Sequence, residues 1–193
     1  MLRKFALTMV LTLLCSFYTH ETFAIQMSDT EALEASIKEA ILKGGSGIKP
    51  SVKVKLIRLD KVPQNNYYTA LFSFYSHSST YLGEASFIKK NDEYQYAGSL
   101  NYGVNRINQT TITVDNQLYS IFYGDNFNER LGSISIKFPN KTFKYNIKSV
   151  DSPYFVHFQK LPIADEKEAY PSRITCYDQN HRELTWHQCA RVK

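Results

Sequence analysis

YYTALFSFY, the stretch from Tyr67 to Tyr75, decides the fold class of this chain. Five of its nine residues are aromatic, and aromatic side chains favour the pleated, half-buried surface of a β-sheet. The whole chain is also rich in aromatic residues, with 14 tyrosines and 12 phenylalanines. We therefore expect Tyr67–Tyr75 to be a central strand in a mostly β protein.

Turn-forming residues lie on both sides of this strand. Pro63-Gln64-Asn65-Asn66 precedes it, His77-Ser78-Ser79 follows it, and Asn91-Asp92-Glu93 follows the next apolar stretch. Connections this short join antiparallel neighbours. The expected strands are Ser51–Leu59, with a bulge near Leu56-Ile57, then Tyr67–Tyr75, Tyr81–Lys89 and Tyr94–Leu100.

A helix is expected before these strands, over Ser28–Lys43. Ser28 and Glu31 have the spacing of a capping box, and the glycines from Gly44 to Gly47 end the helix. A narrow apolar stripe and two i,i+4 charge pairs support it: Leu33, Ile37, Ala40 and Ile41, with Glu34–Lys38 and Glu39–Lys43. Such a stripe must pack on something, and the strands that follow are the candidate.

The second half of the chain contains only strand patterns. Residues 101–109 form a polar break, which we interpret as a boundary between the halves. The expected strands are Thr111–Val114, Gln117–Tyr123, Ser133–Phe138, Thr142–Lys148, Tyr154–Gln159, Arg173–Tyr177 and Glu183–Trp186. Strands of this length and spacing suggest a small sandwich.

These patterns give an α+β, mostly β chain. One N-terminal helix packs on an antiparallel sheet in residues 25–103, and a small all-β sandwich-like unit follows in residues 104–193.

Residues 1–24 have the order of a secretory signal peptide. Arg3 and Lys4 precede an apolar run from Phe5 to Phe17, and small residues allow cleavage after Ala24. The run is too short for an uncleaved membrane anchor, which needs about 20 apolar residues. A lipid on Cys15 is the other alternative, although Leu14 stands where a small residue is usual. We expect an exported or envelope-associated protein with no membrane span.

Charge excludes one class of partner. The full chain has 23 basic and 18 acidic residues, and removing Arg3, Lys4 and Glu21 leaves 21 − 17 = +4. This excess is spread along the chain, whereas nucleic-acid binding needs a concentrated basic stripe. We expect another extracellular protein or a wall polymer as partner, and no nucleic acid. The oligomeric state is left open.

Cys176 and Cys189 are the two cysteines that remain after cleavage. An even pair in an exported protein predicts a disulfide. The bond would close a loop of about 14 residues and pin the C-terminal tail. With His181 and His187, the same cysteines are the elements of a zinc site, but zinc needs reduced thiolates. We favour the disulfide and expect neither metal nor cofactor.

Catalytic patterns are weak. Ser86-x-x-Lys89 has the spacing of penicillin-recognising serine enzymes. That motif needs a helix, whereas here it lies in a strand that points the two side chains to opposite faces. His157 lies in a strand pattern without an assignable nucleophile.

Tyrosines of the first half are the best candidates for binding, because exposed aromatic rings stack on sugars or form protein interfaces. They are Tyr67, Tyr68, Tyr75, Tyr81, Tyr94 and Tyr96. Our first hypothesis is an exported, non-catalytic binding or accessory protein of the bacterial envelope or its surroundings. The alternatives are an inhibitor of an extracellular protease or wall hydrolase, and a secreted hydrolase that uses His157 or His187.

Residues 118–185 resemble small exported proteins of Bacillus-type bacteria in the order of four short motifs. These are Phe122-Tyr123-Gly124, Ile134-x-Ile136-x-Phe138, Tyr154-Phe155-Val156-x-Phe158 and Ile174-x-x-Tyr177-Asp178-x-Asn180-x-x-x-Leu184. The resemblance implies a secreted β domain and brings no activity. In those proteins the last turn often ends in glycine, where this chain has His181.

Overall fold

The computed structural model describes residues 27–44, 47–63, 65–126, 131–139, 141–147, 153–162, 170–185 and 188–189. The expected signal peptide therefore lies outside the described residues. Helix α2 (Met27–Lys43) is followed by β1 (Val54–Lys61), β2 (Tyr67–Ser76), β3 (Ser79–Lys90), β4 (Glu93–Gly103), β5 (Ile107–Val114), β6 (Gln117–Asp125), β7 (Ser133–Lys137), β8 (Thr142–Asn146), β9 (Tyr154–Lys160), β10 (Arg173–Tyr177) and β11 (Glu183–Leu184).

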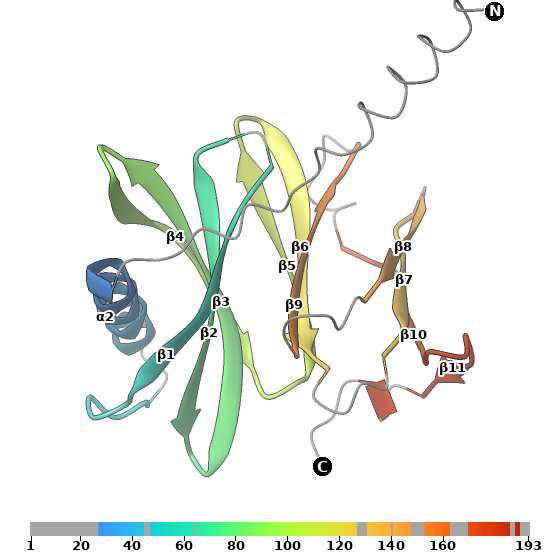
Figure 1. Cartoon of the computed structure of the whole chain (residues 1–193), viewed down its shortest axis with the longest axis horizontal. Helices are drawn as coiled ribbons and strands as arrows, with labels where there is room; N and C mark the ends of the chain where they lie inside the picture. Colours follow the sequence, from blue (N-terminus) through green and yellow to red (C-terminus); the bar gives the residue numbers. More distant parts are fainter. Residues whose placement is uncertain are drawn as a thin grey trace, which may run out of the picture.

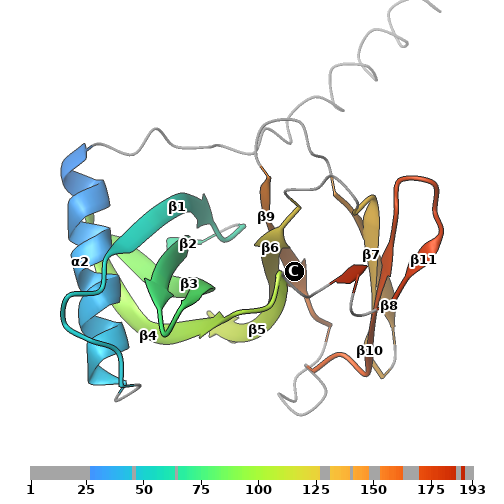
Figure 2. The same cartoon turned by 90° about the horizontal axis from the view of Figure 1, so that it is seen from below.

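The strands form three antiparallel sheets. The helix-bearing sheet has the order β1-β2-β3-β4, the middle sheet β5-β6-β9, and the C-terminal sheet β11-β10-β7-β8. Helix and sheets follow one another as layers (Figure 1 and Figure 2). This arrangement confirms the expected fold class, with one N-terminal helix on an antiparallel sheet and β structure after it.

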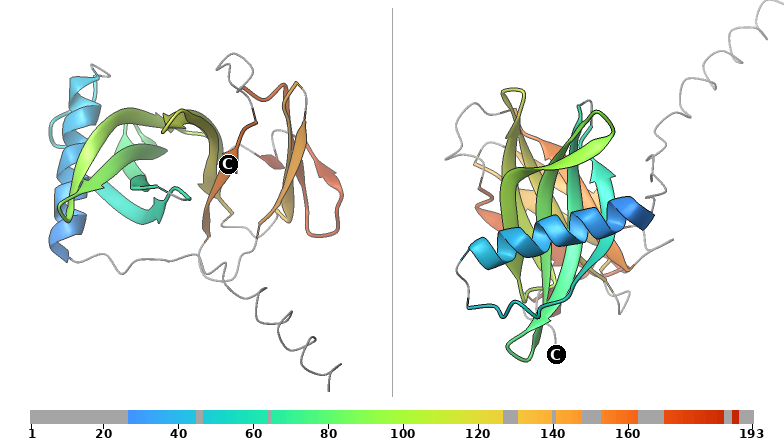
Figure 3. Two further views of the ribbon diagram at one scale, coloured as in Figure 1. Left: turned by 90° about the horizontal axis from the view of Figure 1, so that it is seen from above. Right: turned by 90° about the vertical axis from the view of Figure 1, so that its left-hand side faces the viewer.

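Helix α2 lies across the outer face of the helix-bearing sheet (Figure 3). Leu33, Ile37 and Ile41 are buried, as their spacing predicts, and they pack on apolar side chains of β1 to β3. The expected pair of Glu39 and Lys43 forms, with 2.6 Å between its charged atoms. Glu34 binds the edge of the sheet, because its Oε1 accepts a hydrogen bond of 2.8 Å from the backbone N–H of Leu56.

Two-residue turns join the long hairpins. Both central residues have positive φ at His77-Ser78, at Asn91-Asp92 and at Asp115-Asn116. Turns of this hand match the twist of the flanking strands, which explains the unbroken pairing beside them. The predicted bulge is present too, since the pairing of β1 with β2 shifts between Leu56 and Arg58.

Strand β6 is buried on both faces, which makes the middle sheet a shared wall. Leu118 and Phe122 face the C-terminal sheet and join the apolar cluster between the two sheets. Ile121 and Tyr123 face the other way and join a cluster that contains Leu71 of the helix-bearing sheet. The side chains of the two halves therefore share one core cluster.

Residues 101–109, expected to form a polar break, belong mostly to strands. Strand β4 continues to Gly103 and β5 begins at Ile107, so only residues 104–106 lie between them. The polar side chains of this segment bond across strands. The amide of Asn101 donates to Thr110 at 2.8 Å, and that of Gln109 donates to Ser120 at 3.0 Å. The division at residues 103 and 104 stays a prediction.

The predicted disulfide between Cys176 and Cys189 is present, with 6.1 Å between the Cα atoms. Both cysteines are buried in the core between the middle and C-terminal sheets. The bond joins the C-terminal segment to β10. In the turn that follows β10, His181 has a φ of 62°, so a histidine occupies a position that favours glycine.

Candidate functional site

The six candidate tyrosines do not form one exposed surface. Helix α2 covers the face that carries several of them: Tyr68 is buried, and Tyr81 and Tyr94 are half-buried in the core below the helix. Tyr67 packs against the cluster between the helix-bearing and middle sheets. Tyr75 and Tyr96 remain exposed, by 65% and 39%. Any binding role for these residues is therefore divided among separate places on the sheet.

One of those places is an open depression of about 640 Å³, which we call the Tyr68 depression. The β1–β2 and β3–β4 turns form it together, because antiparallel pairing brings both turns to the same end of the sheet. A backbone hydrogen bond of 3.0 Å from the N–H of Lys89 to the carbonyl of Asn66 joins the two turns. The lining residues are Lys61, Asn65, Asn66, Tyr68, Lys89, Asn91 and Asp92.

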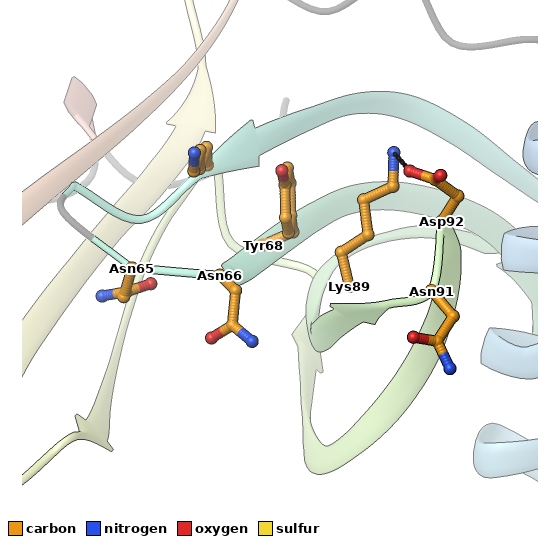
Figure 4. Close-up of a pocket in the computed structure, with 7 residues that line it drawn as sticks. Asn65, Asn66, Tyr68, Lys89, Asn91 and Asp92 are labelled. Atoms are coloured by element: carbon orange, nitrogen blue, oxygen red, sulfur yellow. Dashed lines mark ion pairs between the residues drawn. The ribbon is translucent and has the colours of Figure 1, made fainter.

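Aromatic rings support the cationic side of this depression. In Figure 4 the ring of Tyr68 and the side chain of Lys89 stand beside each other and point the same way. Tyr94 packs edge-on against Tyr68 with 5.2 Å between ring centroids, and the ammonium of Lys89 lies 5.3 Å from the centroid of Tyr94. The Asp92 carboxylate lies 3.4 Å from the same ammonium.

Electrostatics keep this ammonium charged. Two neighbours raise the pKa of the Lys89 ammonium, and Tyr94 has a larger effect than Asp92. Burial raises the pKa of the Tyr94 phenol. With Lys61 the depression carries two ammonium groups against the one carboxylate of Asp92.

The amides of the depression divide into two kinds. The Asn65 side chain stabilises its own turn, since Oδ1 accepts from the N–H of Tyr67 at 2.8 Å and Nδ2 donates to the carbonyl of Pro63 at 3.2 Å. Asn66 and Asn91 are exposed, and their side chains make no hydrogen bond within the described ranges. These two amides can both donate to and accept from a bound molecule. The site can thus hold a hydroxyl-bearing, negatively charged ligand.

The structure does not assemble the predicted catalytic patterns. Ser86 is buried in β3 and Lys89 reaches the surface beside Tyr94, so their side chains are separated as the strand pattern predicts. His187 lies outside the described residues. Cys176 and Cys189 are joined to each other, so neither presents a thiolate to a metal.

His157 lies in a cluster that sequence reasoning did not find. Its ring stacks on Tyr145 with 4.0 Å between centroids, and burial raises the pKa of this tyrosine. Nearby, Arg58 donates to the carbonyl of Tyr154 at 3.5 Å and binds Asp60 through two nitrogens.

A second group missed by the sequence analysis is Glu84, which is completely buried between the helix-bearing and middle sheets. Its Oε1 accepts from the amide of Asn101 at 2.9 Å and from the hydroxyl of Ser99 at 3.5 Å. Its Oε2 has no partner in the described part of the chain. Burial raises the pKa of this carboxyl to about 7.

Within the described residues, no helix combines the length and the apolar character that crossing a membrane requires. Comparison with protein-family models, with curated proteins and with solved structures found no match to this chain.

Proposed function

We propose that this protein is an exported, non-catalytic binding protein that holds an anionic polymer of the cell wall in the Tyr68 depression. The observation that carries the proposal is the convergence of two ammonium groups and two available amides on one open concavity. Export is supported by the signal-like residues 1–24 and by the Cys176–Cys189 disulfide, because such bonds persist in oxidising compartments.

The shape of the depression favours a polymer over a small free molecule. It is open to solvent and is not a closed cavity, so its occupant need not be small enough to be enclosed. Wall polymers present repeated hydroxyl groups and negative charges. The amides of Asn66 and Asn91 match the hydroxyl groups, and Lys61 and Lys89 match the charges.

The test is sedimentation of the mature protein with isolated bacterial cell walls, before and after extraction of their anionic polymers. The wild type should bind intact walls and lose this binding on extracted walls. Replacing both Lys61→Ala and Lys89→Ala should weaken binding about tenfold, because each exposed charge pair contributes up to about 1 kcal/mol.

A matched control removes the same amount of charge elsewhere. Lys137 and Lys160 are exposed on the C-terminal and middle sheets, outside the depression. Lys137→Ala with Lys160→Ala should leave wall binding within twofold of the wild type. Equal losses in the two double variants would show that net charge alone attracts the protein to the wall, and the proposed site would be abandoned.

A further inference from the structure

A second open depression lies at the opposite end of the helix-bearing sheet. It has a volume of about 530 Å³, and we call it the Tyr75 depression. The segment before β1 and the β2–β3 turn form it, and Figure 1 shows this turn at the end of the sheet away from the β1–β2 turn. The lining residues are Lys49, Ser51, Val52, Lys53, Tyr75, Ser76, His77 and Ser78.

An aromatic ring stands exposed at this depression. Tyr75 is 65% exposed, whereas the neighbouring Val52 is only 7% exposed and closes the bottom with apolar surface. Tyrosines placed in this way often contribute much of the energy of protein–protein interfaces, because the ring buries a large area at little cost in conformational entropy. The Tyr68 depression differs, since its tyrosine is buried.

The charge at the Tyr75 depression has one sign. Lys49 and Lys53 line it, and none of the described residues around it is acidic. An occupant with carboxylates would therefore find complementary charge in the same depression as the exposed ring.

Both walls are held in place before any partner arrives. His77 and Ser78 form a two-residue turn with φ values of 48° and 62°, and the Ser76 hydroxyl lies 3.1 Å from Nδ1 of His77. On the other wall, the N–H of Val52 donates to the carbonyl of Lys49 at 3.0 Å. A preorganised surface loses less entropy on binding than a flexible loop.

We infer that the Tyr75 depression docks an acidic segment of an extracellular partner protein, with an apolar side chain of that segment on Tyr75 and Val52 and its carboxylates on Lys49 and Lys53. This inference stands apart from the proposed wall binding, because the two depressions share no residue. Together the two would make the protein a connector between the wall and a second protein.

The experiment selects short random peptides on the immobilised mature protein and measures the affinity of the selected peptides by fluorescence anisotropy. Selected peptides should combine Asp or Glu with an aromatic or aliphatic residue. Tyr75→Ala should weaken them about tenfold, the order expected for a central interface aromatic. Lys49→Ala with Lys53→Ala should weaken binding of the acidic peptides and reduce the dependence of their affinity on salt concentration, because fewer charge pairs remain to be screened.

Tyr170 provides the matched control, since it is 64% exposed and outside the depression. Tyr170→Ala should leave the peptide affinity unchanged. Lys61→Ala with Lys89→Ala should also leave it unchanged, whatever that variant does to wall binding, so the two proposals fail separately. Circular dichroism of each variant confirms the fold, and exposed side chains of this kind are replaced without unfolding.

Three results would overturn the inference. Selection could yield no peptides or peptides without acidic residues. The selected peptides could bind Tyr75→Ala as tightly as the wild type. The Lys61→Ala with Lys89→Ala variant could weaken the peptides as much as Tyr75→Ala does, which would place the peptides in the Tyr68 depression instead.

Discussion

Replacing Glu84 with glutamine should remove most of the pH dependence of stability below neutral pH. Glu84 is 0% exposed, and burial raises the pKa of its carboxyl from 4.5 to about 7. Asn101 and Ser99 donate to Oε1 and oppose this rise, but they do not cancel it. The folded protein therefore holds a proton on Glu84 that the unfolded chain releases at lower pH.

The sign and the magnitude follow from this difference. A raised carboxyl pKa means that the folded state binds the extra proton, so the free energy of unfolding falls as pH rises from 4.5 to about 7 and is level above that. The fall amounts to roughly 3 kcal/mol, at about 1.4 kcal/mol for each pH unit. Glutamine keeps a neutral polar group at the same place and does not titrate, so it should be more stable than the wild type at pH 8 by up to about 3 kcal/mol.

Other titratable groups near Glu84 do not produce this window. Tyr123 of β6 and Tyr96 of β4 both interact with the Glu84 charge, and burial raises the pKa of each phenol above its ordinary value near 10. Both therefore stay neutral throughout the range in which Glu84 titrates. The remaining side chains beside the carboxyl, those of Ser99, Asn101 and Thr110, do not titrate.

The assay is urea unfolding of the oxidised mature protein at pH 5, 6, 7 and 8, with the slope m checked for constancy. Glu93→Gln is the control, because it makes the same chemical change at an exposed position in the next strand, β4. The control should follow the wild type at every pH. If Glu84→Gln showed the wild-type dependence, or were the less stable protein at pH 8, the assignment of a neutral buried carboxyl would be refuted.

Three further changes test the packing. Replacing both Cys176 and Cys189 by serine should lower the free energy of unfolding by about 3 kcal/mol in the chain-entropy model. A loss of less than about 1 kcal/mol in urea unfolding would contradict the structural role of the bond. Gly124→Ala should destabilise by about 1–3 kcal/mol, because its Cβ would overlap the carbonyl oxygen of Arg106. A wild-type melting temperature would show that the backbone can move apart there. His181→Gly should stabilise by about 0.5–1 kcal/mol, since glycine tolerates the φ of 62°, and lower stability in the same assay would show that the ring itself contributes.

The elements that could be predicted from sequence are those fixed by local chemistry. The stripe of Leu33, Ile37 and Ile41 predicts the helix within one residue, because apolar spacing and helix geometry share one period. The two-residue turn at Asp115-Asn116 is predictable for a similar reason, since aspartate and asparagine tolerate positive φ. Such signals lie within a few residues of each other.

The error at residues 101–109 shows the limit of local reading. Asn101 and Gln109 look like loop residues because polar side chains are common in loops. Their amides instead bond to Thr110 and Ser120, the first across a turn and the second across a strand pair. Nothing in the segment itself specifies those partners, so the length of β4 and β5 was underestimated.

The candidate site could be predicted only in part. The tyrosines were recognisable as a group. Which of them stays exposed depends on the face of the sheet that α2 covers, so Tyr68 is buried and Tyr75 is exposed. Lys61 and Lys89 come together because the register of β1, β2 and β3 brings two turns to one end. The burial of Glu84 depends on the middle sheet, whose strands lie later in the chain.

The middle sheet also supports the two proposed binding sites, which lie at opposite ends of the helix-bearing sheet. Leu71 and Leu82 of the helix-bearing sheet are buried in a cluster to which β5, β6 and β9 contribute most of the other residues, so the first half would expose much of this face by itself. Helix α2 covers the opposite face, and the strands that carry both depressions are thus held between two layers. Rigid strands keep the turns at their ends in fixed positions. The two proposed binding sites would therefore need the second half of the chain, although none of the residues described in that half lines either depression.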